Sequence, residues 1–292
     1  MASEDSSLTT RLEALERRSA GSARRDGVAR ICIAVLFVGS LILLTSNAWL
    51  MFEISESRDV QSVEHQFWLL CHERSTSAER THAFLELIKA RNTEWKSARL
   101  EKLELAGVDL IAVDVQFANL MEGDLTKASL QEANLFRSSF ELTDLSAANL
   151  SKADLSESAF FKAKLDGANL RDAVLVASSL EQATARNANL ILADLSEAHL
   201  LMTDLTGANL TGANLSNANL EAAILTGTKL SLTQFAGANL KDTDFTDSNW
   251  WRAHGLDDDQ QRVFVKKFAP GKNADPRYKR DFRDWAKGLT SE

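Results

Sequence analysis

The fold of this chain is decided by residues 208–220, which read ANLTGANLSNANL. A small residue, an asparagine and a leucine are followed by two variable residues, and this unit of five repeats without a slip. The same phase runs from Leu100 to Trp250, where 24 of the 31 central positions are Leu and four are Phe. Val115, Ala185 and Trp250 occupy the other three. The segment therefore forms one continuous repeat array.

A period of five fits neither an α-helix nor a flat strand. A helix turns about 100° per residue, so every fifth residue lands on another face. A strand alternates sides with a period of two, so an odd step moves the side chain to the opposite face. The chain must therefore turn a corner once in each repeat, so that every central residue i points to a common axis. Residue i−2 shares the inner side with i, which explains why it is small.

The unit is similar to that of the pentapeptide-repeat family, whose motif is A-(D/N)-L-x-x, and the resemblance covers about half of the chain. It implies a mainly β fold, a right-handed quadrilateral β-helix with four repeats in each coil. Coils stack at about 4.8 Å, so the array gives nearly eight coils, roughly 37 Å long. The leucines expected in the repeat core are Leu120, Leu125, Leu130, Leu135, Leu145, Leu150, Leu155, Leu165, Leu170, Leu190, Leu195, Leu205, Leu210, Leu215 and Leu220.

Four repeats per coil would place residues 20 apart on the same side of the β-helix. One side then has Leu120, Phe140 and Leu200 in the core and several large apolar residues outside it. These form the candidate partner surface: Met121, Leu142, Phe161, Leu201 and Met202. An exposed apolar stripe often marks a contact surface. Coverage by the C-terminal helices or by the stalk before the repeats is the alternative.

The charge of the chain is unevenly distributed. The net charge is −8, but residues 101–250 carry 21 Asp/Glu against 10 Lys/Arg, a net of −11. Residues 251–292 carry 10 basic and 7 acidic residues, a net of +3. An acidic repeat body argues against direct nucleic-acid binding, which needs a positive surface.

Residues 31–52 predict a transmembrane helix. They read ICIAVLFVGSLILLTSNAWLMF, contain no charged residue and are long enough to cross a bilayer. Residues 17–30, just before the span, contain five arginines, whereas only Arg58 follows it over a stretch of similar length. The positive-inside rule then places the N-terminus in the cytoplasm and the repeats in the periplasm or another extracytoplasmic space. Cleavage as a signal peptide near Ala48 is the competing interpretation, although the apolar run continues to Phe52.

These features divide the chain into five parts. They are a cytoplasmic segment with a short helix (1–30), the transmembrane helix (31–52), a helical stalk and N-terminal cap (53–97), the β-helix (98–252) and a C-terminal helical cap (253–292). In the third part a helix is expected from about Ser77 to Asn92, with Phe84 on its apolar side. We expect it to cover the open end of the core, because end coils would otherwise expose leucine to water.

The C-terminal part predicts two helices. The first opens at 257–259 and is ended by Pro270. Asp275 and Pro276 begin the second, with Asp at the cap and Pro in the first turn. Its apolar residues are Tyr278, Phe282 and Trp285. A hydrophobic cap is the simplest role for this part, and a partner-docking element is the alternative.

No catalytic or cofactor motif is present. The chain has no P-loop, no G-x-S-x-G and no H-E-x-x-H, and a smooth prism offers little concavity for an active site. Cys32 and Cys71 give no disulfide framework. A metal site on His65, Cys71 and His72 lacks a second pair of ligands, and His199 is expected to be a surface residue. We therefore expect no enzymatic activity, no cofactor and no metal.

A membrane span, a repeat surface and the lack of catalytic motifs favour a membrane-anchored, non-enzymatic scaffold. We expect it to bind an unidentified protein partner through the acidic β-helix faces. The resemblance supplies the alternative, because some members of the family mimic DNA in size and charge, bind type II topoisomerases and protect against quinolones. Those members are cytoplasmic, whereas the repeats here are expected across the membrane from DNA. A homodimer through the C-terminal aromatic helices is a further analogy with the family.

Overall fold

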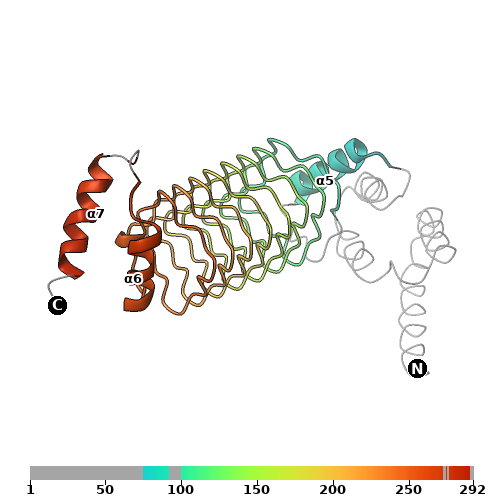
Figure 1. Cartoon of the computed structure of the whole chain (residues 1–292). Coiled ribbons are helices and arrows are strands. Elements are labelled where there is room, and N and C mark those ends of the chain that lie inside the picture. The colour runs from blue at the N-terminus through green and yellow to red at the C-terminus, as the bar shows by residue number, and fades with distance from the viewer. Residues whose placement is uncertain (1–74, 92–99, 272–273, 275, 290–292) are drawn as a thin grey trace, which may run out of the picture. The chain divides into compact units, whose positions relative to one another are not determined.

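The computed structural model describes residues 75–91, 100–271, 274 and 276–289. All of them belong to one compact unit, Leu50–Glu292. The helices of the described residues are α5 (Ser77–Arg91), the 3₁₀ helix η1 (Trp250–Arg252), α6 (Asp258–Lys267) and α7 (Pro276–Leu289). Between α5 and η1 the chain winds into a stack of coils (Figure 1).

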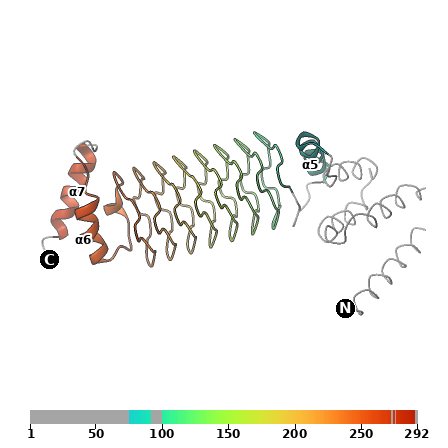
Figure 2. The ribbon, with the colours of Figure 1, turned by 45° about the vertical axis from the view of Figure 1, so that its right-hand side comes forward.

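Each coil contains four repeats. Isolated parallel bridges join residue i−1 of one repeat to the residue 20 positions later, as between Asn119 and Ser139. The same register holds on all four sides and ends with the bridge between Gln234 and His254. Figure 2 shows the resulting parallel coils side by side. The four-repeat coil that the family resemblance implies is therefore present.

Backbone hydrogen bonds connect each repeat to the coils on both sides of it. Leu120 donates its N–H to the carbonyl of Ser139, one coil later, at 2.8 Å. Glu122 donates likewise to Glu141 at 3.0 Å. In the other direction, Ser139 donates to the carbonyl of Ala118 at 2.8 Å. Buried backbone groups are thus satisfied between coils, as the interior of a solenoid requires.

The Asn or Asp at i−1 accepts a hydrogen bond from the one backbone N–H of the repeat that has no backbone acceptor. In the described coils the N–H of residue i+1 has no backbone acceptor. Where residue i−1 is Asn or Asp, its side chain accepts this N–H, as Asn119 Oδ1 does from Met121 at 3.1 Å and Asp124 Oδ1 does from Thr126 at 2.9 Å. Local side-chain-to-backbone bonds of this kind are typical of Asn and Asp. The motif therefore specifies a hydrogen bond as well as a shape.

Every corner places residue i+2 in the left-handed backbone region. From Lys102 to Asp247 the φ of this residue lies between 54° and 72°, and 24 of the corner residues are not glycine. The turn is closed by a bond such as that from Gly123 N–H to the Leu120 carbonyl, 3.2 Å. None of the 24 is Val, Ile or Thr, because a β-branched residue is a strong outlier at positive φ.

The interior is a column of central residues packed with small residues at i−2. All the leucines named above for the repeat core are buried, with at most 4% of their surface exposed. Phe140 and Phe160 stack in successive coils with ring centroids 5.0 Å apart. Nine buried hydroxyls at i−2 each donate to a backbone carbonyl at 2.7–2.9 Å. Each buried leucine contributes about 2 kcal/mol before entropy is subtracted.

Helix α5 packs at the N-terminal end of the core. It starts after a capping box in which Glu79 N–H donates to Thr76 Oγ1 (3.2 Å) and Thr76 N–H donates to Glu79 Oε2 (2.8 Å). Phe84, 1% exposed, belongs to the same hydrophobic cluster as the repeat leucines. Thr81 Oγ1 accepts the N–H of Glu104 in the first coil at 2.9 Å. The helix therefore covers apolar surface and satisfies an end-coil amide.

Helix α6 packs at the C-terminal end of the core. A capping box between Asp257 and Gln260 starts it. Phe264 and Phe268 are buried, and the Phe264 ring lies 5.4 Å from that of Trp250, centroid to centroid. Trp250 Nε1 donates to the Phe268 carbonyl at 3.1 Å. This helix therefore packs on the aromatic side chain that ends the last coil.

Helix α7 is held against the same end by aromatic contacts and one carboxylate. Asp281 accepts the indole N–H of Trp251 at 2.7 Å and pairs with the guanidinium of Arg252. Phe282 and Trp285 are partly buried, and their rings lie 6.1 and 5.2 Å from that of Trp250. The two C-terminal helices thus pack on aromatic side chains that end the repeat array.

The predictions for residues 1–74 lie outside the described residues. They include the short cytoplasmic helix, the span at 31–52 and most of the stalk. Within the described residues, no helix has the length and hydropathy that crossing a bilayer requires.

Candidate interaction surfaces

The β-helix has four sides, and we name each by one core residue: the Leu120, Leu125, Leu130 and Leu135 faces. On each face the outward i−1 residues form a column, and the residues i+1 and i+2 form the edge that follows the face. The 20-residue register assigns every outward residue of the repeats to one column or one edge.

The five residues of the candidate partner surface share one edge, which follows the Leu120 face and is called the Met121 edge. They are Met121, Leu142, Phe161, Leu201 and Met202. Leu142 N–H bonds the Phe161 carbonyl at 3.0 Å, which places these residues in adjacent coils. Leu142 and Met202 are 51% and 56% exposed, and the other three are half-buried. The coil of Glu181 and Gln182 interrupts the apolar run.

The edge on the other side of the Leu120 face is also apolar, and the sequence analysis missed it. This Phe117 edge contains Phe117, 42% exposed, and Phe136, with ring centroids 5.7 Å apart. The Arg137 guanidinium lies over the Phe136 ring at 5.0 Å. Val176 lies further along the same edge. Applying the 20-residue register to all four sides, rather than to one, would have found it.

Within the described residues, the column between these two edges carries no Asp, Glu, Lys or Arg. Its members are Asn119, Ser139, Ala159, Ser179, His199, Asn219 and Asn239. Four consecutive coils, from Ser139 to His199, lack the Asn or Asp that accepts the N–H of residue i+1. Among the described residues those four amides have no acceptor, and they belong to Glu141, Phe161, Glu181 and Leu201. His199 is exposed, as expected.

The two neighbouring faces are acidic. The column of the Leu125 face contains Glu104, Asp124, Asp144, Asp204 and Asp244. On the Leu135 face, Asp114, Asp154 and Asp194 alternate with Asn134, Val174 and Asn214. Alternation separates the carboxylates by two coil spacings, which limits repulsion along the column.

Hydrogen bonds hold carboxylates of the Leu125 face in their charged form. Burial raises the pKa of Asp144, but bonds from Ser146 and pairing with Lys164 outweigh it, so the pKa lies below its ordinary value. The pKa of Asp204 is lowered in the same way against burial, by bonds from Thr206 and pairing with Arg186. These carboxylates are acceptors for the corner amides as well as surface charges.

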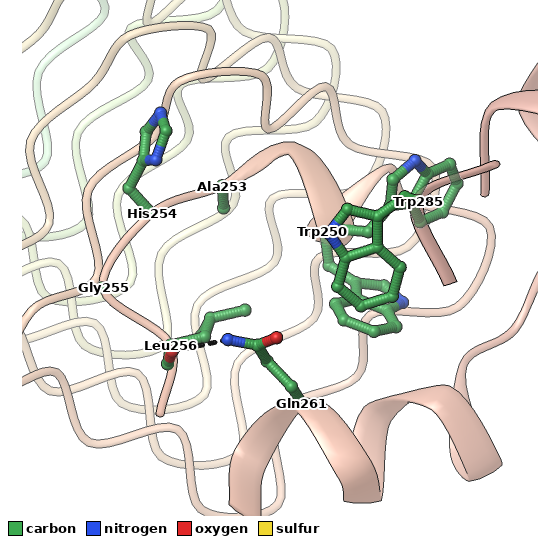
Figure 3. Close-up of a pocket in the computed structure, with 8 residues that line it drawn as sticks. Trp250, Ala253, His254, Gly255, Leu256, Gln261 and Trp285 are labelled. Atoms are coloured by element: carbon green, nitrogen blue, oxygen red, sulfur yellow. Dashed lines mark hydrogen bonds between the residues drawn. The ribbon is translucent and has the colours of Figure 1, made fainter. Parts of the chain in front are cut away.

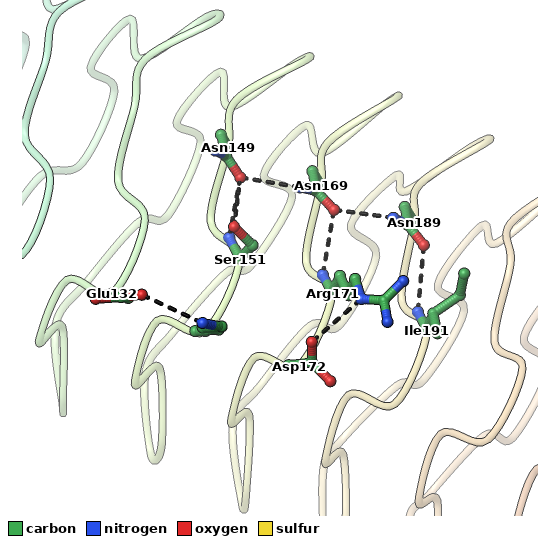
Figure 4. A network of polar contacts seen from close by, with 9 residues as sticks. Glu132, Asn149, Ser151, Asn169, Arg171, Asp172, Asn189 and Ile191 are labelled. Atoms are coloured by element: carbon green, nitrogen blue, oxygen red, sulfur yellow. Dashed lines mark hydrogen bonds and ion pairs between the residues drawn. The ribbon is translucent and has the colours of Figure 1, made fainter.

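The Leu130 face carries an asparagine ladder (Figure 4). Asn169 Nδ2 donates to Asn149 Oδ1 at 3.0 Å, and Asn189 Nδ2 donates to Asn169 Oδ1 at 2.9 Å. Each Oδ1 also accepts a corner N–H, as Asn169 Oδ1 does from Arg171 at 3.3 Å. The polar groups of this face are therefore largely engaged with one another.

A pocket of about 170 Å³ lies between η1, the chain that follows it and the C-terminal helices (Figure 3). It is lined by Trp250, Trp251, Ala253, His254, Gly255, Leu256, Gln261 and Trp285. Gln261 Nε2 donates to the Leu256 carbonyl at 2.9 Å. His254 is the only titratable side chain in this lining, so the pocket brings together no acid–base or nucleophile–base pair.

Metal-ligating residues do not gather in the part of the chain that the structure describes: it holds no group of three or more His, Cys, Asp or Glu suited to a metal ion. The candidate set His65, Cys71 and His72 lies outside the described residues.

Comparisons with known proteins found several solved structures that are similar to this chain. The structure of HetL, a pentapeptide repeat protein involved in heterocyst differentiation regulation from Nostoc sp. strain PCC 7120, is 28% identical over 57% of this chain and 95% of that one (TM-score 0.32). Trypsin-treated QnrB1, a plasmid-mediated fluoroquinolone resistance protein, is 17% identical over 67% and 95% (0.40). A pentapeptide repeat protein from the Arabidopsis thaliana thylakoid lumen is 30% identical over 55% and 81% (0.21). A search of curated proteins found no match.

Two family models match the repeat array. The model of a pentapeptide repeat region covers residues 133–210, and the model of pentapeptide repeats in eight copies covers 104–141 and 213–249. These matches fall within the segment whose phase, corners and coil register are described above. The chain therefore belongs to the pentapeptide-repeat family.

Proposed function

We propose that this chain is a membrane-anchored, non-enzymatic scaffold whose acidic β-helix faces bind a protein partner. The observation that carries the proposal is the pair of carboxylate columns on the Leu125 and Leu135 faces. The stacked coils fix the spacing of these side chains, so little conformational entropy would be lost when a partner binds them. A partner with lysines or arginines at matching intervals fits such a surface.

The anchor in this proposal is the apolar run at residues 31–52. Its length and the arginines before it support a single span with the N-terminus in the cytoplasm. The repeats would then face the periplasm or another extracytoplasmic space, where a tethered prism presents its walls to proteins near the membrane.

Carbodiimide crosslinking in intact membranes tests the partner surface, because it joins carboxylates directly to lysines in contact with them. The informative variant changes three carboxylates of the Leu135 face to amides: Asp114→Asn, Asp154→Asn and Asp194→Asn. Asparagine keeps the Oδ1 that accepts the corner N–H, so the charge is removed and the turn is retained. We expect the full-length chain to give a crosslinked partner that this variant loses.

A control with the same change in net charge places the substitutions on edges instead of columns. It carries Glu132→Gln, Asp172→Asn and Asp247→Asn, and we expect it to keep the crosslinked partner. Equal loss in both variants would show that only net charge matters. No crosslinked partner from the unmodified chain, or none lost in the column variant, would overturn the proposed surface.

Mimicry of DNA toward a type II topoisomerase is the second candidate, and the two acidic columns favour it. It requires the repeats to be in the cytoplasm, on the same side of the membrane as DNA. A topology reporter fused after Glu292 separates the two candidates. An exported signal excludes the DNA mimic, whereas a cytoplasmic signal excludes the extracytoplasmic scaffold.

A further inference from the structure

We propose that the Leu120 face is a dimer interface that binds the same face of a second copy, with the two β-helix axes parallel. The interface would comprise the uncharged column from Asn119 to Asn239 and the Met121 and Phe117 edges on either side of it. This inference is independent of the proposed function, and it uses a different surface from the C-terminal aromatic helices.

The first argument is the shape and composition of the face. Ser139, Ala159 and Ser179 are small, so two such faces can approach closely, and no charged side chain of the column would be buried. Large apolar residues lie along both margins, including Phe117, Leu142 and Met202, which are 42%, 51% and 56% exposed. Burying them would remove apolar surface from water, and the column itself would add no charged side chain to the interface.

The second argument is the area. The seven coils from Asn119 to Asn239 each occupy about 4.8 Å along the axis, so the face is roughly 34 Å long, and one side of a coil is roughly 15 Å wide. Two copies would together bury roughly 1,000 Å², which is the least area expected of a biological interface. The estimate uses projected area, and the side chains of the two edges add to it.

The third argument is charge complementarity at matched height. A two-fold axis parallel to the β-helix axes brings the Met121 edge of one copy against the Phe117 edge of the other. Residues 141–142 then meet residues 136–137 of the second copy, because five residues raise the chain by only about 1.2 Å. Leu142 faces Phe136 of the second copy, and Glu141 faces its Arg137. Apolar and charged groups both find suitable partners.

The next coil continues the pattern. Lys162 meets Glu157 of the second copy, and Glu157 already pairs with Arg137 of its own chain at 2.5 Å. The four groups Glu141, Arg137, Glu157 and Lys162 would alternate in sign across the interface. An antiparallel dimer centred on this coil would instead place Lys162 against Lys162 and Glu157 against Glu157, which is unfavourable. Charge therefore selects the parallel arrangement.

Leu142→Lys in the purified full-length chain tests the interface by sedimentation. The substitution places a positive charge against Phe136 and Arg137 of the second copy. Leu192→Lys is the matched control, because Leu192 has the same corner position, φ of 59° and similar exposure, 54% against 51%. It lies on the edge between the Leu130 and Leu135 faces. We expect a dimer whose dissociation constant rises at least tenfold in Leu142→Lys and is unchanged in Leu192→Lys.

Two results of this experiment would overturn the proposal. One is a monomeric full-length chain at micromolar concentration. The other is a dimer that Leu142→Lys leaves intact, since its interface would lie elsewhere, as in a dimer through the C-terminal helices.

Crosslinking through single cysteines keeps the proposal testable if Leu142→Lys fails to fold. In a full-length background with Cys32→Ser and Cys71→Ser, Ser139→Cys places a thiol on the Leu120 face. Ser129→Cys places one at the same repeat position on the opposite Leu130 face. With a short bis-maleimide we expect covalent dimers from Ser139→Cys and none above background from Ser129→Cys. Equal yields from the two variants would overturn the proposal.

The direction of the two chains is tested with a third variant, Ser179→Cys. In the parallel dimer, Ser139→Cys and Ser179→Cys each crosslink to their own kind. Crosslinking only when the two variants are mixed would indicate an antiparallel pair centred on Ala159 and would overturn the proposed arrangement.

Discussion

The backbone at Ala147 gives a quantitative test of why the corners of this β-helix exclude β-branched residues. Ala147 lies at position i+2 with a φ of 57°, and it is exposed. Left-handed backbone costs an L-residue about 1–2 kcal/mol. None of the 24 non-glycine corner residues is β-branched, whereas position i+1, one residue earlier, accepts Val176 and Ile191. The difference lies in backbone conformation, because both positions are on the surface.

We expect Ala147→Val to lower the free energy of unfolding by about 1–2 kcal/mol, through the added strain of a branched Cβ at positive φ. Ala147→Gly should raise it by up to about 0.5 kcal/mol. Relief of about 1 kcal/mol of strain is offset by about 0.4–1 kcal/mol of entropy that glycine adds to the unfolded chain. Ser216→Val is the matched control, because Ser216 lies at i+1 and its N–H keeps its bond to Asn214 Oδ1, 3.1 Å.

Chemical denaturation of the full-length chain, followed by circular dichroism, gives the four midpoints. The expected order is glycine at or above alanine, with valine clearly below, and Ser216→Val close to the unmodified chain. If Ala147→Val matched alanine, or if Ser216→Val were equally damaging, the exclusion of β-branched residues would have to come from something other than φ.

Three further outcomes follow from the core, the ladder and the carboxylates. Leu150 is fully buried, so Leu150→Asp should lower the free energy of unfolding by more than a leucine-to-alanine change, which costs about 2–5 kcal/mol, and should abolish a cooperative melt. A milder loss would contradict a dry core. Asn169→Asp removes an Nδ2 donor from the asparagine ladder and places a carboxylate oxygen against Asn149 Oδ1. Denaturation at pH 7 should therefore show that the free energy of unfolding falls by about 1–3 kcal/mol. No loss would mean that the ladder is not stabilising. Burial raises the pKa of Asp204, but hydrogen bonds and pairing with Arg186 outweigh burial, so the pKa in the folded chain is lowered. Charged Asp204 therefore stabilises the fold above its unfolded pKa of about 3.9, and this stabilisation is lost as the pH falls through the lower pKa of the folded chain. Asp204→Asn should therefore flatten the fall of the denaturation midpoint below about pH 4, and an unchanged slope would contradict this assignment.

Signals within a few residues of sequence were enough to predict the coils and the starts of the helices. Within each repeat, the small residue and the leucine determine which side chains face the core. This burial pattern can therefore be predicted without knowing any contact that is distant in the sequence. The starts of α5 and α6 were equally local, because Thr76 with Glu79 and Asp257 with Gln260 are capping boxes. For such elements the physical cause and the sequence signal are the same few residues.

Contacts outside the repeat register could not be predicted in the same way. Asp281 bonds Trp251 from 30 residues away, and no periodicity relates the two positions. The role of the i−1 residue as an amide acceptor emerges only from a count of backbone bonds around the corner. The Phe117 edge is different, because the 20-residue register is enough to predict it from the sequence. The prediction above applied this register to only one side of the β-helix.

The core and the surface of this chain are specified by separate positions of the same repeat. Residues i and i−2 set the coil, whereas residues i−1, i+1 and i+2 differ from face to face, within the limits set by the corner amide and by the positive φ at i+2. The Leu120 face uses this freedom to omit charge, while the faces on either side of it gather carboxylates such as Asp144 and Asp154. In the proposed dimer, the Leu125 face of one copy would continue into the Leu135 face of the other. Pairing through the uncharged side would therefore join two acidic columns into one wall on each side of the dimer, and a basic partner would meet twice the carboxylates that a single chain presents.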